Sequence, residues 1–215
     1  MSTQAIKQKS APKTPKGMQR SRALLLSAID IFVEKGYSGT SLAEIISRAG
    51  GSRSKIYEWY GGKEGLFIAA LELMIDEVYQ EYLKQYREGR SYQEELRIFG
   101  RIFLKEMLRK RALGCARLVF SESVRMPKIG EWFYKQGAEL SYNCFAKVLE
   151  NSVPLDWEEL KRISNWYIES LKSRTYFLCL CDPKYEPTEE EIEKDVIFSA
   201  EIIQAYIRQR VEAQQ

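Results

Sequence analysis

The chain has 215 residues, of which 45% are hydrophobic and 29% are charged, and its formal net charge is +3. This composition is typical of a globular protein with one domain or two small ones, and it argues against wholesale disorder. Histidine is absent, which excludes Ser-His-Asp and Cys-His catalytic sites and most zinc-dependent hydrolases.

Two further features narrow the class of protein. The longest apolar run, Leu66–Ile75, is interrupted by Glu72, and the lysines at the start of the chain are not followed by the apolar core of a secretory signal. We therefore expect a cytoplasmic protein. Since histidine is absent as well, we expect no cofactor and no metal. The cysteines lie in apolar contexts, which favours reduced, buried side chains, with a redox sensor as the alternative: Cys115, Cys144, Cys179 and Cys181.

The positive charge is concentrated at the start of the chain. Residues 1–63 contain eleven Lys or Arg and four Asp or Glu, a net charge of +7, whereas the remainder has a net charge of −4. Residues 1–19 combine lysines with two prolines and few large apolar residues, so we expect a disordered basic arm there. A cationic front on a slightly acidic body indicates a polyanionic partner.

From Arg20 onward the apolar residues follow a helical period, and no convincing strand alternation occurs. The first predicted helix spans Arg20–Lys35 and is stopped by Gly36. A second opens at Ser41, which forms a predicted capping box with Glu44, and ends at the glycine pair 50–51. A third spans Arg53–Tyr60 behind the N-cap Ser52 and ends at the glycine pair 61–62.

The rest of the chain predicts six more helices, which makes nine in an all-α fold. Cap residues, glycines and prolines place them at 63–88, 91–111, 115–125, 128–150, 156–181 and 188–210. Three regions follow from this pattern: the basic arm 1–19, a small helical domain 20–66 and a larger helical domain 67–215.

The second and third predicted helices form a recognisable pair. Two short helices joined by a glycine turn and packed on a preceding amphipathic helix make a helix-turn-helix. In the second of the two, Ile56 and Tyr60 are the apolar anchors, which leaves an outward surface of Arg53, Ser54, Lys55, Tyr57 and Trp59. Such a helix fits the major groove, with its N-terminal N–H groups facing phosphate and its cations reaching base edges. The pattern therefore predicts DNA binding.

This region also resembles the DNA-binding domain of TetR-family transcriptional regulators, over residues 24–67. The resemblance is carried by Leu24, Leu25, Ala28, Phe32, Gly36, Tyr37, Thr40, Ser41, Leu42, Ile45, Ala49, Gly50, Ser52, Ile56, Tyr57, Tyr60, Lys63, Glu64, Leu66 and Phe67. It implies a dimeric repressor of about nine helices that a small molecule, bound in the C-terminal half, releases from a palindromic operator.

The resemblance also assigns roles to residues. It implies phosphate contacts from Thr40 or Ser41, from Tyr57 and from Lys63, and base or groove contacts from Arg53, Ser54 and Lys55; Ser52 and Trp59 complete the predicted DNA-binding set. The chain departs from the family in three places. Gly51 replaces an apolar turn residue that usually seals the motif, Ser54-Lys55 replaces a common Gly-Thr, and Trp59 stands where His is frequent.

The C-terminal half is similar to the AefR-type C-terminal domain at Arg117–Ser123, Pro127, Phe133, Tyr134 and Gly137. Its aromatic and Met-rich helices are interspersed with polar groups, as in helical domains that enclose a ligand, although most of these side chains are expected to be simple core. We expect a small, largely apolar ligand, with candidate contacts from Phe103, Met107, Arg117, Phe120, Trp132, Phe133, Gln136, Trp166 and Arg174.

The last two predicted helices carry unusually wide apolar surfaces. A terminal helix that is apolar nearly all round is expected to be buried on two sides, which predicts a symmetric homodimer. The candidate interface residues are Trp166, Ser170, Val196, Ala200, Ile203 and Ile207.

The leading hypothesis is therefore a ligand-responsive, DNA-binding repressor. A DNA-binding regulator or activator without an effector is the main alternative, and a helical protein-interaction adaptor is another, although it leaves the basic arm unexplained. An enzyme finds no support, because the sequence shows no histidine, no metal-binding cluster and no phosphate-binding glycine loop.

Overall fold

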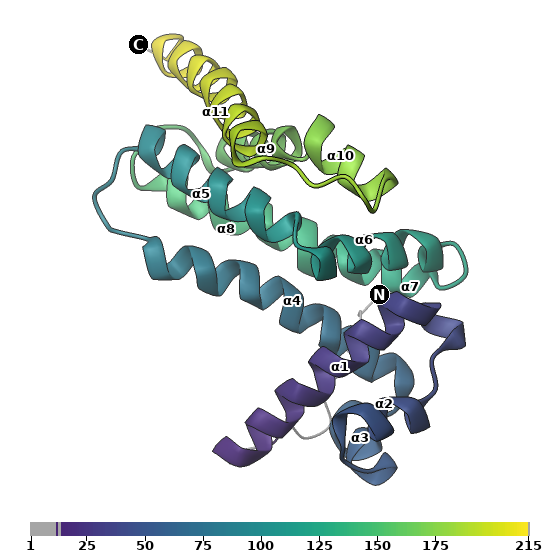
Figure 1. Cartoon of the computed structure of the whole chain (residues 1–215). Coiled ribbons are helices and arrows are strands. Elements are labelled where there is room, and N and C mark those ends of the chain that lie inside the picture. The colour runs from purple at the N-terminus through teal and green to yellow at the C-terminus, as the bar shows by residue number, and fades with distance from the viewer. Residues whose placement is uncertain (1–11, 13, 215) are drawn as a thin grey trace. The chain divides into compact units, whose positions relative to one another are not determined.

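The computed structural model describes residues 12 and 14–214, and this part of the chain is helical with no β-strand (Figure 1). The helices in chain order are α1 (Pro15–Gly39), α2 (Leu42–Ala49), α3 (Arg53–Tyr60), α4 (Lys63–Gln85), α5 (Tyr92–Met107), α6 (Lys110–Ser123), α7 (Pro127–Phe133), a π-helix η1 (Tyr134–Glu139), α8 (Leu140–Glu150), α9 (Trp157–Leu171), α10 (Arg174–Cys181) and α11 (Glu189–Glu212). The predicted all-α class is confirmed. Counting the continuous run α7–η1–α8 once, the described residues form ten helices, one more than predicted.

The chain divides into two compact units. Unit 1 contains the described residues up to Asp76 together with Gly114–Gly130, and unit 2 contains Glu77–Leu113 and the residues from Glu131 onward. The predicted division at residues 66 and 67 differs from this one, because the first half of α4 and most of α6 pack with α1–α3. Helices α4, α6 and α7 therefore contribute residues to both units.

Helix α1 supplies the central face of unit 1. Its apolar residues recur at helical spacing, so Leu24, Ala28, Ile31 and Phe32 are all buried on one side of the helix. The helix begins at Pro15, where the Thr14 side chain accepts a hydrogen bond from the backbone N–H of Gly17 at 3.1 Å. The expected disordered arm 1–19 is thus wrong for residues 15–19, and residues 1–11 and 13 lie outside the described part.

The predicted stop at Gly36 is confirmed by the backbone. Gly36 has φ 74° and ψ 166°, which breaks the helical geometry before the short extension to Gly39. Gly114, which follows the predicted helix 91–111, does not act as a helix stop. Helix α5 already ends at Met107, and Gly114 lies inside α6, where a Cβ would come within 2.4 Å of Val33 Cγ1. This glycine is required for close packing of α6 on α1.

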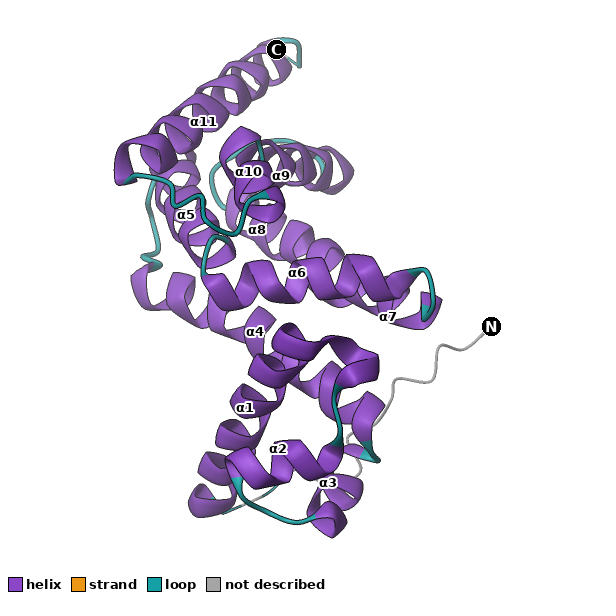
Figure 2. Cartoon of the chain, turned by 45° about the vertical axis from the view of Figure 1, so that its right-hand side comes forward, coloured by secondary structure: helices purple, strands orange, loops and turns teal. Residues whose placement is uncertain are grey.

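Unit 2 has a core of aromatic side chains between α5, α8 and α9. Helix α11 packs on α5 and α9 (Figure 2). The Phe99 and Phe145 rings stack with centroids 4.2 Å apart, and the Tyr167 ring lies 5.2 Å from that of Phe145. The Tyr167 hydroxyl is fully buried and donates a hydrogen bond to the carbonyl of Leu96. Gly100 faces this hydroxyl, because a Cβ there would come within 2.1 Å of it.

Four helices begin at a cap residue that is followed three positions later by glutamate, and these caps divide into two groups. Ser91 with Glu94 and Thr188 with Glu191 form complete capping boxes. Ser41 and Asp156 act as N-caps, but their glutamate partners do not complete the boxes. Glu44 pairs instead with Lys35, and Glu159 accepts hydrogen bonds from the Tyr206 hydroxyl at 2.7 Å and from Arg210 Nε at 3.0 Å.

The tenth helix results from a break in the predicted segment 156–181. Lys172 has φ −81° and ψ 42°, outside helical geometry, so α9 ends at Leu171 and α10 begins at Arg174. None of the described helices is long and apolar enough to cross a membrane.

Candidate nucleic-acid interface

The helix-turn-helix is held in place by a few buried side chains. Ile45 of α2 and Ile56 of α3 are completely buried, and Tyr60 is 6% exposed. The Tyr60 hydroxyl lies 2.6 Å from the hydroxyl of Ser21, which joins the end of α3 to α1. Burial of this phenol raises its pKa. Both predicted anchors of α3, Ile56 and Tyr60, thus point into the core as expected.

The turn between the two helices depends on glycine. Gly50 has φ 76° and Gly51 has φ 105°, values that residues with a Cβ rarely adopt. Ser52 then caps α3, because its hydroxyl accepts a hydrogen bond from the Lys55 backbone N–H at 3.3 Å. The resulting geometry exposes the first turn of α3.

The outward surface of α3 carries the predicted DNA-contacting residues. Arg53, Ser54 and Lys55 are exposed, and the Tyr57 side chain is 54% exposed. Lys55 has two neighbours on its own helix, since its Nζ lies 2.8 Å from Glu58 Oε2 and 5.6 Å from the centre of the Trp59 ring. An exposed ion pair of this kind is weak, so Lys55 remains available for exchange to a DNA acceptor.

The structure separates the two alternatives at the start of α2. Thr40 is only 3% exposed, and its hydroxyl donates to the backbone carbonyl of Gly36 at 2.8 Å. The predicted phosphate contact from Thr40 is therefore not available in this conformation. Ser41 is exposed while its hydroxyl accepts the N-cap bond from Glu44, so it remains the candidate of the pair.

Lys63, the predicted phosphate contact at the start of α4, is held against an aromatic cluster. Its ammonium lies 4.5 Å from the centre of the Tyr37 ring, and that ring stacks on Phe32 at 5.7 Å. Partial burial lowers the pKa of Lys63, against the opposing influence of Glu122. The side chain is thus fixed in position, and its contact with phosphate stays a prediction.

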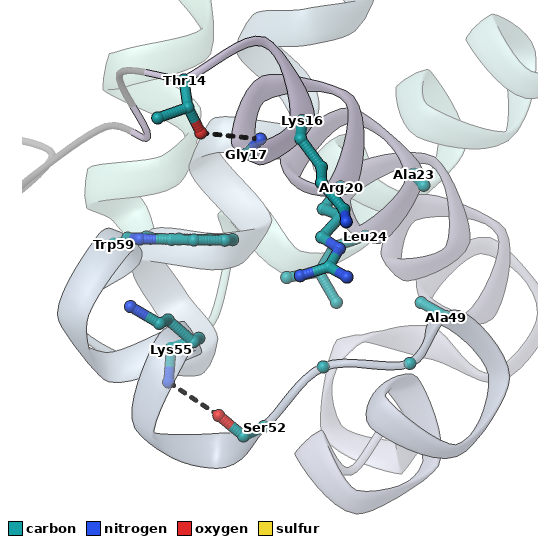
Figure 3. A pocket seen from close by; sticks show the side chains of 12 residues that line it. Thr14, Lys16, Gly17, Arg20, Ala23, Leu24, Ala49, Ser52, Lys55 and Trp59 are labelled. Atoms are coloured by element: carbon teal, nitrogen blue, oxygen red, sulfur yellow. Dashed lines mark hydrogen bonds between the residues drawn. The ribbon is translucent and has the colours of Figure 1, made fainter.

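Two cations that the sequence analysis did not select join this surface. Lys16 and Arg20 of α1 line a hollow that is also lined by Lys55 and Trp59 of α3 (Figure 3). Lys16 was missed because residues up to 19 were assigned to a disordered arm, and Arg20 was given no role although it begins the first predicted helix. The helical spacing of Lys16 and Arg20, four residues apart, was the available signal.

The predicted dimer-interface residues lie in different surroundings from one another. Val196, Ala200, Ile203 and Ile207 are buried in the core of unit 2, while Ser170 is half-buried and donates a hydrogen bond to the Tyr167 carbonyl. Of the predicted set only Trp166 is an exposed apolar side chain, and Phe198 and Ile202, which were not predicted, are exposed on the helix packed against it. Trp166 and Phe198 are each 66% exposed and Ile202 is 49% exposed, on the packed helices α9 and α11.

The predicted ligand contacts fall in both units. Arg117 and Phe120 belong to unit 1, and the other seven belong to unit 2: Phe103, Met107, Trp132, Phe133, Gln136, Trp166 and Arg174. Of these residues Phe103 is buried, whereas Phe120, Gln136, Trp166 and Arg174 are exposed. A hollow of about 350 Å³ in unit 2 has none of them in its wall and is mainly polar, formed by Tyr134, Glu139, Tyr142, Asn143, Glu158, Lys161, Arg162 and Asn165.

Among residues 12 and 14–214, no group of three or more Cys, Asp or Glu side chains is arranged to hold a metal ion. The expectation of reduced, buried cysteines is met only in part. Cys115 and Cys179 are buried, Cys144 is half-buried and Cys181 is exposed, and all four are free thiols.

Comparison with known proteins assigns the family. Residues 24–70 match the model for bacterial regulatory proteins of the tetR family, and residues 94–206, about half of the chain, match the model for the AefR-like transcriptional repressor C-terminal domain. The chain belongs to the TetR family of transcriptional regulators. The segment that matches the tetR-family model contains the helix-turn-helix, of which α3 is the second helix.

Curated relatives of this TetR-family regulator are similar over part of their length. It is 28% identical over 120 residues to the uncharacterized HTH-type transcriptional regulator YezE of Bacillus subtilis, a match that covers 54% of this chain and 62% of YezE. It is 35% identical over 69 residues to the transcriptional regulator RutR of Escherichia coli, a match that covers 32% of each chain. The chain thus spans less than two thirds of the length of these relatives.

Solved structures share the whole fold. A TetR-family transcriptional regulator from Mesorhizobium loti superposes with a TM-score of 0.75 at 21% identity, covering 90% of this chain and 98% of that one. The flavonoid-responsive regulator FrrA superposes with a TM-score of 0.67 at 22% identity, covering 87% of this chain and 96% of FrrA. At these identities the likeness concerns the fold.

Proposed function

We propose that this TetR-family regulator is a homodimeric repressor that leaves a palindromic operator when a small, largely apolar ligand binds. The observation that carries the proposal is the recognition helix, whose Arg53, Ser54 and Lys55 are exposed on the first turn while Ile56 and Tyr60 anchor it. A helix fixed in this way presents its N-terminal turn to the major groove without further folding.

Selection of bound sequences from a random duplex pool tests the DNA-binding part. We expect two inverted half-sites whose centres lie about one helical turn, or a multiple of it, apart. Replacing Arg53 or Lys55 by alanine should cost about 1–3 kcal/mol of operator affinity and relax the preference at one position of each half-site. Lys63→Ala should instead weaken all duplexes about equally and reduce the salt slope by roughly one for each phosphate that the lysine neutralises.

The control for these variants is Lys35→Gln, because Lys35 is equally exposed in unit 1 but lies outside the recognition helix and pairs with Glu44. Its affinity for the selected sequence should stay near the wild-type value. Loss of operator preference to the same degree in Lys55→Ala and Lys63→Ala would contradict the division into base and phosphate contacts.

The surface we propose for the second copy consists of Trp166, Phe198 and Ile202. Phe198 and Ile202 lie four residues apart on one face of α11, and Trp166 is exposed on α9, which packs against α11; these are the helices where the dimer was predicted. Val196, Ala200, Ile203 and Ile207 lie on the inner face of α11 and support this surface from within the unit. The dimer contact is thus proposed for the outer face of the same helix.

Measuring the oligomeric state by sedimentation tests whether the dimer contact uses the outer or the inner face of α11. Phe198→Asp should convert a dimer to a folded monomer at micromolar concentration, because it places an unpaired charge in an apolar contact. Phe177→Asp on α10 is the matched control, since Phe177 is also 66% exposed, and it should remain dimeric. Ile203→Asp should unfold unit 2, because Ile203 is 5% exposed within its core. A monomeric wild-type protein would refute the dimer.

The proposal of a small-molecule effector is based on the AefR-like C-terminal domain and on the aromatic candidate residues of unit 2. A thermal-shift screen of small apolar compounds tests it, and flavonoids belong in the screen because the structural neighbour FrrA is described as flavonoid-responsive. A compound that stabilises the protein should lower operator affinity by a factor of about 5–150. If no compound shifts the melting temperature, an effector-independent regulator is the better description.

Activation of transcription is the specific alternative to the proposed repression. Among the similar curated proteins, ComR of Escherichia coli is a transcriptional repressor, 37% identical over 75 residues, and FasR of Mycolicibacterium smegmatis is an activator, 29% identical over 79 residues. Transcription from a reporter that carries the selected sequence, measured with and without this protein, distinguishes the two.

A further inference from the structure

The hollow beside the recognition helix has the size of a ligand site. It occupies about 550 Å³ within unit 1, between the first turns of α1, the turn 50–52 and the exposed side of α3 (Figure 3). Sites for small molecules usually occupy about 300–1,000 Å³. Ser52, Lys55 and Trp59 of its lining belong to the predicted DNA-binding set, whereas none of the predicted effector contacts lines it.

One wall of the hollow carries few side-chain atoms. Ala49, Gly50 and Gly51 form one wall with a single methyl group among them, and Ala23 faces them from α1. The positive φ angles of both glycines disfavour any larger residue there.

The lining has one sign of charge. Lys16, Arg20 and Lys55 are among the twelve lining residues, and no Asp or Glu is. All three cations lie at the surface, and Figure 3 shows Lys16 and Arg20 extending from α1 on the side that faces α3. A cationic rim of this kind attracts an anion.

The interior supplies apolar and aromatic surface. Leu24 is buried below the hollow, and the half-buried Trp59 ring forms a flat wall that reaches toward α1 (Figure 3). An indole face of this kind stacks on a second flat ring system. The site thus combines a flat apolar wall with cations on the rim.

We propose that this hollow binds a small planar aromatic anion, such as an aromatic carboxylate, and that the bound anion competes with DNA for Lys55. The ring system stacks on Trp59 while the anionic group is held by Arg20 and Lys16. Lys55 belongs both to the hollow and to the predicted base-contacting surface. The ligand therefore acts directly on the recognition helix, in addition to any effector that binds unit 2.

The geometry favours an aromatic anion over a segment of DNA backbone. A backbone phosphate is far smaller than the hollow. It also gains nothing from apolar contact with Leu24 or from stacking on Trp59. Nonspecific backbone contacts are mostly made by cations on open surfaces. The two occupants also make different predictions, because only the small anion binds in the absence of DNA.

The test follows the Trp59 indole N–H signal by NMR during titration with 2-naphthoate and, separately, with its neutral analogue 2-naphthamide. The chain has four tryptophans, and Trp59→Phe identifies the signal. We expect a saturable shift with naphthoate only. Arg20→Gln and Lys16→Gln should each weaken naphthoate binding by about 3-fold, the scale of one exposed charge contact, and Lys35→Gln should not.

Two additional measurements complete the test. Ala49→Leu should abolish naphthoate binding by filling the hollow, and circular dichroism checks that this variant is folded; Arg20→Gln, at the surface, provides the result if it is not. Naphthoate should weaken binding to duplex DNA in the wild-type protein and less so in Arg20→Gln. Equal shifts with naphthoate and naphthamide, no shift, or substitutions that change DNA binding alone would each overturn the proposal.

Discussion

Gly100→Ala is expected to destabilise unit 2, although alanine is normally the better helix former. Alanine in a helix interior is worth about 1 kcal/mol over glycine. Here its Cβ would come within 2.1 Å of Tyr167 Oη and 3.2 Å of Leu171 Cδ2. The tyrosine has no room to retreat, because its ring is fully buried beside Phe145 and its hydroxyl donates to the carbonyl of Leu96.

The expected cost has two parts. Displacing the ring leaves a buried hydroxyl without its acceptor, which costs about 1–3 kcal/mol. Forcing an extra methyl group into a packed core costs about 1–3 kcal/mol more. After subtraction of the helix-propensity gain, Gly100→Ala should lower the free energy of unfolding by about 1–5 kcal/mol.

A double-mutant cycle with Tyr167→Phe provides the assay, with the free energy of unfolding measured in urea. Removing the hydroxyl removes the closest clash, so Gly100→Ala should cost less in the Tyr167→Phe background by about 1–2 kcal/mol. If the two substitutions are additive, or if Gly100→Ala stabilises the protein, the reasoning from this close approach is refuted.

Three further results are expected. Glu58→Gln should strengthen binding to random duplex DNA and steepen its salt dependence, because it removes the carboxylate that lies 2.8 Å from Lys55 Nζ; a fluorescence titration at several salt concentrations measures this. Thr40→Val should lower the free energy of unfolding by about 1 kcal/mol, by removing the hydroxyl that donates to Gly36, while operator affinity stays unchanged. Burial raises the pKa of Glu106, which lies near the charges of Arg109, Glu81, Glu77 and Lys84. The folded state therefore binds the carboxyl proton of Glu106 more tightly than the unfolded state does. The contribution of Glu106 to the free energy of unfolding falls as pH rises above about 4. Between about pH 4 and 7 the urea midpoint of Glu106→Gln should therefore rise relative to that of the wild-type protein. If the difference between the two midpoints does not change with pH, burial of Glu106 does not affect stability.

The local structure of the helix-turn-helix was predicted well because its signals are local. Ser52, the glycines at 50, 51 and 61, and the anchors Ile56 and Tyr60 each act within one or two turns of helix, so sequence spacing is enough to place them. The burial of Thr40 was missed for the opposite reason. Its hydroxyl reaches the carbonyl of Ile31, nine residues earlier, after the chain has turned at Gly36.

Two other errors of the sequence analysis come from tertiary packing: one concerns Gly114 in unit 1, and the other concerns α11 in unit 2. Gly114 has the sequence signature of a helix stop, yet its role is set by Val33, more than eighty residues away in sequence. The apolar character of α11 was recognised, but periodicity alone does not say which face a neighbouring helix covers. The structure shows that Val196 and Ile203 face the core, whereas Phe198 and Ile202 face outward.

The eight-residue α3 would not persist as a free peptide, since helices shorter than about 12–15 residues are marginal in water. Its shape is maintained by Ile56 and Tyr60 and by the caps at its two ends, while five of its positions, Arg53, Ser54, Lys55, Tyr57 and Glu58, are exposed. Folding and the proposed base recognition therefore depend on separate residues of one short helix. Substitutions at those five positions are free to alter operator preference with little penalty in stability, so a gene duplicate of this protein has a short mutational route to a new operator.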